Sequence, residues 1–475
     1  MKLKSLILGS VAAAGLSTAG YAADLGVLTS LDVCDALGLS GLTISSDTNC
    51  LQLSGGVSYE FAIGDYRTEG AVAGTFDGNR NIPIDNAGAD WATKVEAWLK
   101  AVGTADSDFG PAKAVIKIKE VDLNRVNNTA ALGPVFDNDG ERVGLYIDEA
   151  YVSVGDTTVI MAGKKGSIAN LGDDEPFNYL GLFNSDAIDG KGVGIDGDDT
   201  RLGGHVIQVV SDLGNGVNVG VGLENLNDET PNAGATGFQN GYTAANAARA
   251  GTLVGVVSYA GEGITAHLTG AAFGILDGNV QEWALHAGAT GTFDAFKVRG
   301  AIAYRENFKG TTADILNGLA SVEGTFDLFK IALSGEVANV RNAPANADTG
   351  NVGDYTDYGF GGSIGVNVTE GVAINLGARY FFDDTNTVIG GDKSTWQVAA
   401  QLVAAVTETI KMTGEIGGYF GNAIADNPAF ANDSVFYGAA ELAWAPGGGF
   451  TSSLKGEVNS ENAYKVTFKA AKSFE

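Results

Sequence analysis

The sequence predicts an all-β fold, a transmembrane antiparallel β-barrel with an even strand number of roughly 16 to 20 and a direct count of about 20. Three observations predict it. Apolar and polar residues alternate along most of the chain, short turns alternate with longer polar loops, and aromatic residues stand near the expected strand ends. A soluble sandwich would also alternate. The many strands without a second motif favour a barrel with an apolar outer band and a polar lumen.

The first segment of the chain, residues 1–22, has the pattern of a cleavable export signal. Two lysines precede an apolar stretch, Leu6–Leu16, and small residues lead to an expected cleavage site after Ala22. The remainder, 23–475, is expected to be a single barrel domain, because no Ser/Pro-rich or single-sign linker divides it. No later run reaches the roughly 20 apolar residues of a membrane-spanning helix. If the chain crosses a membrane, it does so with strands.

The only two cysteines of the chain, Cys34 and Cys50, lie just before the first expected strand. An exported chain reaches an oxidising compartment, where a sole pair of cysteines usually closes. The sequence therefore predicts a disulfide between them. In the strand that follows, apolar residues alternate with polar ones, which sends the two sets to opposite faces. The apolar set is Leu51, Leu53, Val57, Tyr59 and Phe61.

Hairpins with short turns are expected through the rest of the chain. One such turn is Asp294-Ala295-Phe296, between two alternating segments. The phrase Gly-Thr-Phe-Asp begins at Gly291 and again at Gly324, which indicates a hairpin duplication. Alternation also predicts which residues point outward near the middle of their strands. They include Ile302, Leu376 and Ile416.

The charge of the chain is strongly negative, at −28 from 57 acidic and 29 basic residues. Binding to nucleic acid requires clustered Lys and Arg against the phosphates, so this balance argues against a nucleic-acid partner. The negative charge suits a surface that interacts with cations. Part of the excess of acidic residues would also be explained if they only keep a secreted protein soluble.

The segment Thr43–Val57 carries a resemblance to a known family. It contains both the second cysteine and a Gly-Gly pair, and it is followed later by Glu149-Ala150-Tyr151-Val152 and Ala162-Gly163-Lys164. On these residues, with Cys34 ahead of them, the chain resembles the alphaproteobacterial porins of the rhizobial type. That family has a Tyr-Ile-Pro-Gly-Thr-Asp-Thr-Cys-Leu segment before Gly-Gly-Tyr. Here two serines replace Pro-Gly, and Val57 replaces the tyrosine.

The resemblance implies a homotrimer in the bacterial outer membrane, in contact with membrane lipid and lipopolysaccharide, through which small hydrophilic solutes and ions diffuse passively. It also implies that the third long loop folds into the lumen as a constriction. Two features depart from the family. Its members resemble sixteen-stranded barrels, whereas the direct count here is about 20. The usual terminal aromatic, here Phe474, is followed by Glu475.

The third long loop, about Lys165 to Thr200, matches the family's constriction loop in position and is rich in carboxylates. Its acids are Asp173, Asp174, Glu175, Asp186, Asp189, Asp196, Asp198 and Asp199. We expect some of them to narrow a pore and to face basic lumen residues across it. Those basic residues are Lys94, Lys113, Lys117 and Lys164. Opposed charges of this kind would orient dipolar solutes and favour cations. The alternative is an extracellular loop whose acids are merely solvated.

The glycine-punctuated run Gly192–Thr200 suggests two further ligands. Its glycines match a dinucleotide fingerprint, but no helix or partner acid stands at the required spacing. Its oxygen-rich residues Asp196, Asp198 and Asp199 form a weak Ca²⁺ candidate that fits no EF-hand loop. We therefore expect no cofactor and no dedicated metal site.

Enzymatic function has little support in the sequence. The three histidines, His205, His267 and His286, belong to no zinc-binding motif, and the last two are expected to face the lumen. The run Gly361–Gly365 matches the Gly-x-Ser-x-Gly pattern of a nucleophile elbow, but it lies within an alternating strand. The leading hypothesis is a passive diffusion channel. The alternatives are a structural or adhesive barrel, whose long loops such as Asp65–Asp90 and Asn225–Ala248 bind surfaces, and a membrane-embedded hydrolase.

Overall fold

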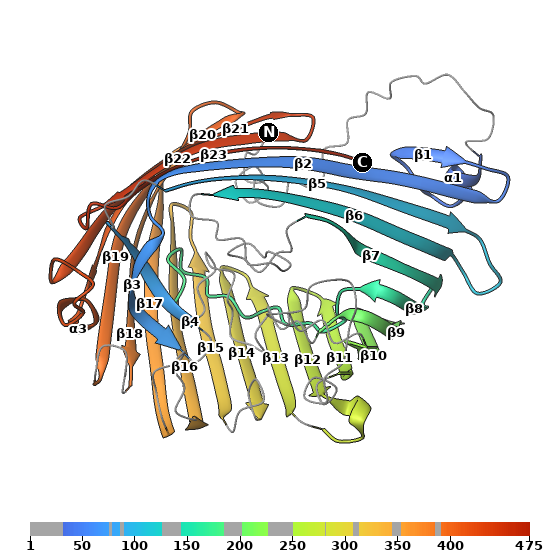
Figure 1. The fold of residues 1–475 in the computed structure, drawn as a ribbon, viewed down its shortest axis with the longest axis horizontal. Coiled ribbons are helices and arrows are strands. Elements are labelled where there is room, and N and C mark those ends of the chain that lie inside the picture. Colours follow the sequence, from blue (N-terminus) through green and yellow to red (C-terminus); the bar gives the residue numbers. More distant parts are fainter. Residues whose placement is uncertain are drawn as a thin grey trace.

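The architecture is a closed antiparallel β-barrel (Figure 1). The computed structural model describes residues 32–75, 78–85, 90–125, 144–184, 202–226, 250–280, 282–306, 313–343, 353–384 and 391–475. Strand β2 (Asn49–Asp65) pairs with β5 (Asp90–Ala105) along one edge and with β23 (Tyr464–Phe474) along the other, and this closes the sheet. Of the 21 strands in the sheet, β1 lies outside the ring, which leaves 20 in the barrel. The direct count from the sequence is confirmed.

Every other barrel strand pairs with the next one in chain order. These strands are β6 (Ala112–Arg125), β7 (Gly144–Gly155), β8 (Thr158–Lys165), β9 (Gly204–Gly214), β10 (Val217–Glu224), β11 (Thr252–Gly261), β12 (Ile264–Phe273), β13 (Glu282–Phe293), β14 (Phe296–Glu306), β15 (Asp314–Thr325), β16 (Phe329–Ala343), β17 (Gly353–Thr369), β18 (Val372–Asp383), β19 (Lys393–Ala405), β20 (Ile410–Phe420), β21 (Ser434–Gly447) and β22 (Phe450–Asn459).

The smaller elements lie at the barrel's ends and in its loops. They are α1 (Asp32–Ala36), β1 (Leu42–Ser45), the hairpin β3 (Thr68–Thr75) and β4 (Gly78–Ile84), the short 3-10 helix η3 (Ile275–Asp277) and α3 (Asn422–Ala425). No helix among the described residues is both long enough and apolar enough to span a membrane.

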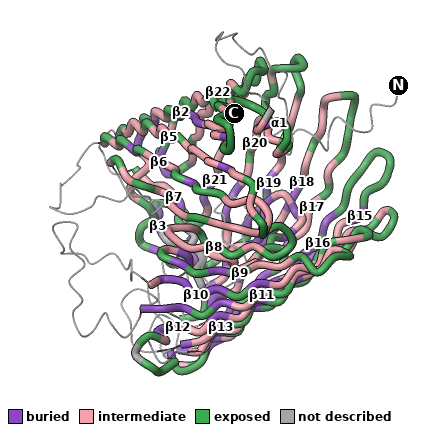
Figure 2. Tube along the Cα trace, turned by 90° about the vertical axis from the view of Figure 1, so that its right-hand side faces the viewer, coloured by how far each residue is buried: buried purple, intermediate pink, exposed green. Residues whose placement is uncertain are grey.

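Each strand has an exposed outer face and a more buried inner face, and the two alternate along the tube in Figure 2. The outward positions predicted from the alternation are exposed: 52% for Ile302, 52% for Leu376 and 68% for Ile416. Their neighbours on the other face are buried, for example Ala301 and Ala303 on either side of Ile302. The period-2 pattern of a strand therefore separates an apolar outside from an inside that carries most of the buried polar groups.

The two ends of the barrel differ in the length of their connections. At one end the turns are short. Strands β13 and β14 are joined by Asp294 and Ala295 alone, and Asp294 has a positive φ of 52°, which aspartate tolerates better than most residues. At the other end most of the connections are longer, and the longest of those between described strands joins β8 to β9. This asymmetry is the one that the sequence predicts.

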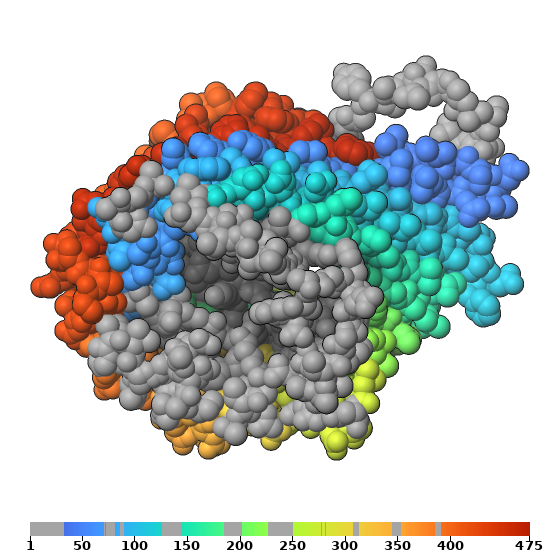
Figure 3. Space-filling model, in the orientation of Figure 1, coloured from blue at the N-terminus to red at the C-terminus, as the bar shows by residue number. Residues whose placement is uncertain are grey.

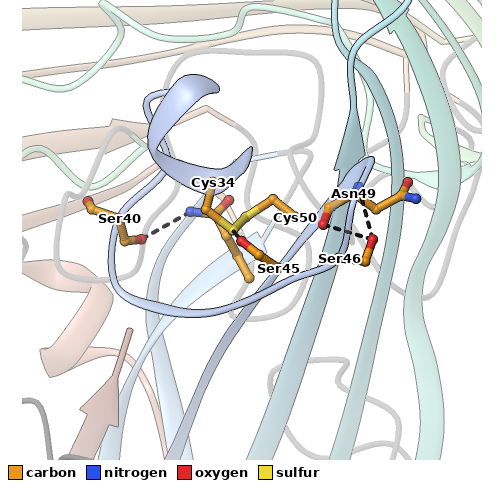
Figure 4. Close-up of a disulfide and its surroundings, with 7 residues drawn as sticks. Cys34, Ser40, Ser45, Ser46, Asn49 and Cys50 are labelled. Atoms are coloured by element: carbon orange, nitrogen blue, oxygen red, sulfur yellow. Dashed lines mark hydrogen bonds between the residues drawn. A yellow bond between two sulfur atoms is a disulfide. The ribbon is translucent and has the colours of Figure 1, made fainter. Parts of the chain in front are cut away.

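The N-terminal segment covers an overhang of β2. Strand β23 pairs with β2 only as far as Gly55, and β1 pairs with residues 50–53 beyond that point. The C-terminal residue packs next to it, since a Cβ placed on Gly41 would lie 3.2 Å from the carbonyl carbon of Glu475. The predicted disulfide between Cys34 and Cys50 is present and fastens α1 to β2 (Figure 4). The backbone groups of the overhang are thus paired rather than left as an open sheet edge.

The first long loop folds back against the barrel wall instead of projecting away from it. The β3–β4 hairpin packs with α3 and strands β18 to β20, as Figure 1 shows in blue against orange. Its Val72 and Ile82 are buried in one apolar cluster with Tyr419, Ile424 and Phe430. Thr395 donates a hydrogen bond to the carbonyl of Val72. This part of the Asp65–Asp90 segment is therefore tied to the wall, which the sequence pattern did not reveal.

Candidate pore and its inner loop

The described half of the third long loop, residues 166–184, follows the inner face of the barrel across many strands. Its backbone amides donate hydrogen bonds to polar side chains on that face. The donor–acceptor pairs are Ile168 N to Glu224 on β10, Asn170 N to Thr269 on β12, Phe177 N to Ser321 on β15, and Asn184 N to Glu336 on β16. In Figure 1 the segment is the green trace that leaves β8 and passes inside the strands. The wall thus offers a series of acceptors to an irregular backbone that needs them.

The two ends of this loop meet at one carboxylate. Glu224 Oε1 accepts hydrogen bonds from Ile168 N at 3.0 Å and from Gln208 Nε2 at 2.8 Å. Its other oxygen accepts one from Gly203 N at 2.7 Å. Glu224 and Gln208 are both fully buried. The hydrogen bonds that a buried carboxylate accepts offset the cost of removing its charge from water. Glu224 therefore holds the two ends of the loop together, at a point that we call the neck of the loop.

Asp173 attaches the middle of the loop to the wall. Thr265 Oγ1 donates to Asp173 Oδ1 at 2.8 Å, and Thr290 donates to the same oxygen. Arg299 Nη2 lies 4.0 Å from Oδ1, and His267 Nδ1 lies 3.7 Å from Oδ2. Burial alone would raise the pKa of Asp173, but the two threonine hydrogen bonds and the nearby Arg299 and His267 hold it below its ordinary value. Asp173 is a charged anchor.

The next two acids of the loop have different surroundings. Burial raises the pKa of Asp174 from its ordinary 3.8 to about 6, with a further increase from the neighbouring Glu175. Glu175 is exposed, and its backbone carbonyl accepts a hydrogen bond from Arg299 Nη1 at 2.7 Å. Among the described acids of this loop, Glu175 is therefore the one whose carboxylate lies open to solvent.

The far end of the described segment is held by a carboxylate and an aromatic contact. Asn184 N donates to both oxygens of Glu336, at 3.1 Å each, and its side chain donates to Asn317 Oδ1 at 2.8 Å. The ring of Phe183 lies 4.2 Å from the guanidinium of Arg379. The two hydrogen-bonded pairs join residues 133 and 152 positions apart in the chain. The spacing of residues in the sequence does not predict these contacts.

The two lumen histidines form a buried pair. His267 Nε2 and His286 Nδ1 are 2.8 Å apart, and their rings stack with centroids 5.0 Å apart. Both side chains are buried on the inner face of β12 and β13, beneath the loop. The third histidine, His205, lies on the outer face of β9. Ser363, within the run that resembles a nucleophile elbow, accepts a hydrogen bond from Tyr179 N at 3.4 Å and acts here as a wall contact for the loop.

Three of the four predicted basic residues face the lumen: Lys94, Lys113 and Lys117. Lys117 forms an ion pair with Asp148 at 2.6 Å, and next to it Lys100 pairs with Glu149 at 3.0 Å. The pairing of β6 and β7 shifts by one residue between Lys117 and Ile118, and such a bulge lets two adjacent acids meet lysines on one face. The described loop acids contact the β12–β14 wall, not these lysines.

Lys164, the fourth, lies on the outer face, which corrects the prediction. It pairs across strands with Ala150 and His205, in the same face as Val152 and Ile207, whose side chains are exposed. The strand ends in two successive lysines, and only one of them can face inward. That residue is Lys165, whose ammonium lies 5.4 Å from the ring of inward-facing Tyr151.

Several predicted residues lie outside the described part of the chain. They are Asp186, Asp189, Asp196, Asp198 and Asp199, and they include the whole Ca²⁺ candidate. Within the described ranges, no group of three or more His, Cys, Asp or Glu side chains is arranged to hold a metal ion.

The barrel is hollowed at the centre of the face shown in Figure 3, inside the ring of strands. Buried polar groups line the wall. On the β10–β18 side the described loop covers many of them, and on the β5–β7 side lysines and acids pair with one another. The arrangement can admit water and ions, because the inner surface offers charges and hydrogen-bonding groups.

Comparisons with known proteins find only solved structures of low similarity. No family model matches the sequence, and no curated protein does. Among solved structures, Acinetobacter baumannii OccAB4 is 11% identical with a TM-score of 0.44, covering 89% of this chain and 98% of its own. Pseudomonas aeruginosa OccK11 is 10% identical with a TM-score of 0.43, covering 89% and 96%. The anion-selective porin from Comamonas acidovorans is 13% identical with a TM-score of 0.35, covering 90% and 100%. At this level of similarity, the barrel architecture rests on the strand pairing of the chain itself.

Proposed function

We propose that this protein is a porin of the bacterial outer membrane, a water-filled channel through which small hydrophilic solutes and ions diffuse passively. The observation that carries the proposal is the closed 20-strand barrel with an exposed apolar outer face and a charged, hydrogen-bonding inner face. A closed barrel is the only sheet that satisfies every backbone group in lipid. An apolar outside and a polar inside are what a lipid-embedded channel requires.

The loop 166–184 would narrow this channel from the β10–β18 side. Its anchors at Glu224, Asp173 and Glu336 support a rigid constriction, because each is held by several hydrogen bonds. A rigid loop keeps the pore open at a constant size, whereas a loose one would block it at intervals. The undescribed acids Asp186 to Asp199 belong to the same loop and would add negative charge to it.

A preference for cations is part of the proposal. The chain carries a net charge of −28, and a pore with excess carboxylates lowers the energy of a passing cation. Lysines at the β5–β7 wall are partly neutralised by Asp148, Glu149 and Glu96. Glu175, exposed on the loop, would then contribute to the field along the path of the ion.

The remaining features of the proposal concern the cell. The export signal at residues 1–22, the homotrimer and the rhizobial type of the family follow from the sequence and its resemblance. Membrane lipid and lipopolysaccharide would contact the outer face. Size measurement of the detergent-purified protein by light scattering tests the trimer, and N-terminal sequencing of mature protein tests cleavage after Ala22.

Planar-bilayer recording of purified protein tests the channel. We expect stepwise ion conductance that rises with salt concentration, and a reversal potential of cation-selective sign in a KCl gradient. Folded protein that inserts into the bilayer without conducting would contradict the channel and favour a plugged structural or adhesive barrel. An anion-selective reversal potential would contradict only the cation preference.

A further inference from the structure

The outer face of the barrel carries exposed aromatic side chains in two belts. Near the loop ends of their strands lie Trp91 on β5, Trp396 on β19 and Tyr464 on β23. Near the short turns lie Phe293 on β13 and Trp444 on β21. All five are between 40% and 58% exposed. Belts of this kind lie at the two levels where a barrel meets the headgroups of the lipid.

Seven adjacent strands, β6 to β12, lack these belts. They run from teal to yellow-green along one side of the barrel in Figure 1, and every residue in them is described. Their Phe, Tyr and Trp residues are Tyr146, Tyr151, Tyr259 and Phe273. Tyr146 pairs with inward-facing Lys119, Tyr151 faces inward as well, and Phe273 is 1% exposed. Within these seven strands, only Tyr259 is an aromatic residue on the outer face.

The outer face of β6–β12 is aliphatic instead. Val152, Ile160, Ile207, Val221 and Leu268 are each between 51% and 59% exposed. Neighbouring strands lie about 4.8 Å apart and the apolar band of a barrel is about 25 Å tall, so seven strands present on the order of 800 Å². That is about the area that each partner of a stable protein complex buries.

A shallow groove crosses this face between β11 and β12. Gly255 pairs directly with Gly270, and directly paired residues of antiparallel strands share a face. Leu253, Val257 and Leu268, two residues away along the same strands, are exposed, so both glycines lie on the outer face. A Cβ placed on Gly255 would find no heavy atom within 4 Å. Small residues of this kind let a neighbouring protein surface approach closely within a membrane.

We propose that the outer face of β6–β12 is the surface through which copies of this chain associate. The inference rests on the proposed membrane location and homotrimer, and it assigns the surface that the trimer uses. A face buried against protein does not meet lipid headgroups and therefore needs no aromatic belts. Seven of the 20 barrel strands span roughly a third of the circumference, which is the share that each barrel of a threefold ring turns toward the axis.

A ring also brings two different parts of the surface into contact, because each copy meets one neighbour on either side. The β11–β12 edge of one copy then packs on the β6–β7 edge of the next. The groove at Gly255 and Gly270 receives aliphatic side chains of that edge, where Ile116 and Val152 are exposed.

Gly255→Trp tests this contact. The indole extends into open space outside its own barrel, but it fills the groove that the next copy would occupy. In light scattering of the full-length protein in mild detergent, we expect native protein to have the mass of three copies and Gly255→Trp that of one. The matched control is Gly414→Trp. Gly414 lies on β20 between exposed Met412 and Ile416, and a Cβ there also has no heavy atom within 4 Å. This variant should remain a trimer.

Photo-cross-linking of otherwise native protein provides a second readout. Benzoylphenylalanine in place of Val257, on the proposed surface, should join two chains on illumination. The same group in place of Leu402, which is 41% exposed on β19, should not. Cross-linked chains from Leu402 but not from Val257, or a trimer that Gly414→Trp dissociates and Gly255→Trp does not, would overturn the proposal and place the contact on the aromatic side of the barrel.

Heat-modifiable migration in gels verifies that each variant is a folded barrel, and bilayer recording of the same samples reports the proposed channel. Native protein that conducts as a single copy would overturn the trimer and this surface together, while the channel would stand. Native trimers that dissociate in Gly255→Trp but do not conduct would refute the channel alone.

Discussion

Glu224 accepts a hydrogen bond from the backbone amide of Ile168 at 3.0 Å, and with its other oxygen it holds Gly203, at the far end of the same loop. One buried carboxylate thus joins the entry and the exit of a segment that spans more than thirty residues. Loop closure is entropically unfavourable, so a fixed neck reduces the number of conformations open to the rest of the loop.

The first prediction concerns this neck. Glu224→Ala removes the acceptor of three buried hydrogen bonds, and we expect the loop to move in and out of the pore, with frequent transient closures in single-channel traces. Glu60→Gln is the control, because Glu60 lies on the inner face and pairs with Lys469, on β23. Traces of Glu224→Ala as quiet as those of Glu60→Gln would show that the neck does not restrain the loop.

The disulfide supplies a second prediction. Cys34 and Cys50 close a loop of 16 residues, which contributes about 3 kcal/mol in the chain-entropy model. The double variant Cys34→Ser/Cys50→Ser should therefore unfold at lower urea concentration in detergent, with its conductance retained. Intact-mass analysis of the native protein should show no thiol available for alkylation. Two alkylated cysteines in unreduced protein would contradict the bond.

The orientation of the strands leads to a third prediction. Ile302→Arg places a charge on the exposed outer face, where it costs about 2–4 kcal/mol at the midplane of a bilayer. Thr413→Arg should be tolerated, since Thr413 lies one step from exposed Met412, on the inner face of β20. Folding yield into lipid vesicles measures both. Equal yields would contradict this assignment of the two faces, and a lower yield for Thr413→Arg would reverse it.

The sequence was sufficient for the strands, the closure and the disulfide, because those follow from local pattern. Alternation identifies the two faces of a long strand such as β2, and the turn at Asp294 identifies a hairpin. The pattern failed at β8, where the eight residues end in Lys164 and Lys165, and only the register with β7 and β9 decides which lysine faces inward.

The wall contacts of the third long loop and of the β3–β4 hairpin could not be predicted, since they join residues far apart in the chain. Asn184 meets Glu336 across 152 positions, and Thr395 meets Val72 across 323. These pairs depend on how the barrel brings its strands together, and in the sequence Glu336 and Thr395 are simply two more polar residues of alternating strands.

The fourth prediction concerns pH. The pKa of Asp174 is raised to about 6, so this side chain is ionised above that pH and neutral below it. Loss of a negative charge from the loop should reduce cation preference as the pH falls from 7 to 5. In Asp174→Asn this pH-dependent step should be absent, with the reversal potential already at the low-pH value. Identical pH profiles of native and variant protein would show that Asp174 does not act on the pore.

The last prediction separates the charge of the loop from its attachment. Glu175 is exposed and its side chain can be neutralised without loss of an anchor, whereas Asp173 holds Thr265, Thr290, Arg299 and His267. Glu175→Gln should therefore shift the reversal potential in a salt gradient toward neutrality at low salt, with little change at high salt, because charges are screened within about 10 Å at 0.1 M. Asp173→Asn should instead increase channel noise at every salt concentration, since an amide binds Arg299 and the threonines less strongly.

The triple variant, in which Asp173, Asp174 and Glu175 are all changed to their amides, should show both effects. A reversal potential that stays unchanged in the triple variant would place these acids outside the ion path, as in an extracellular loop whose carboxylates are only solvated.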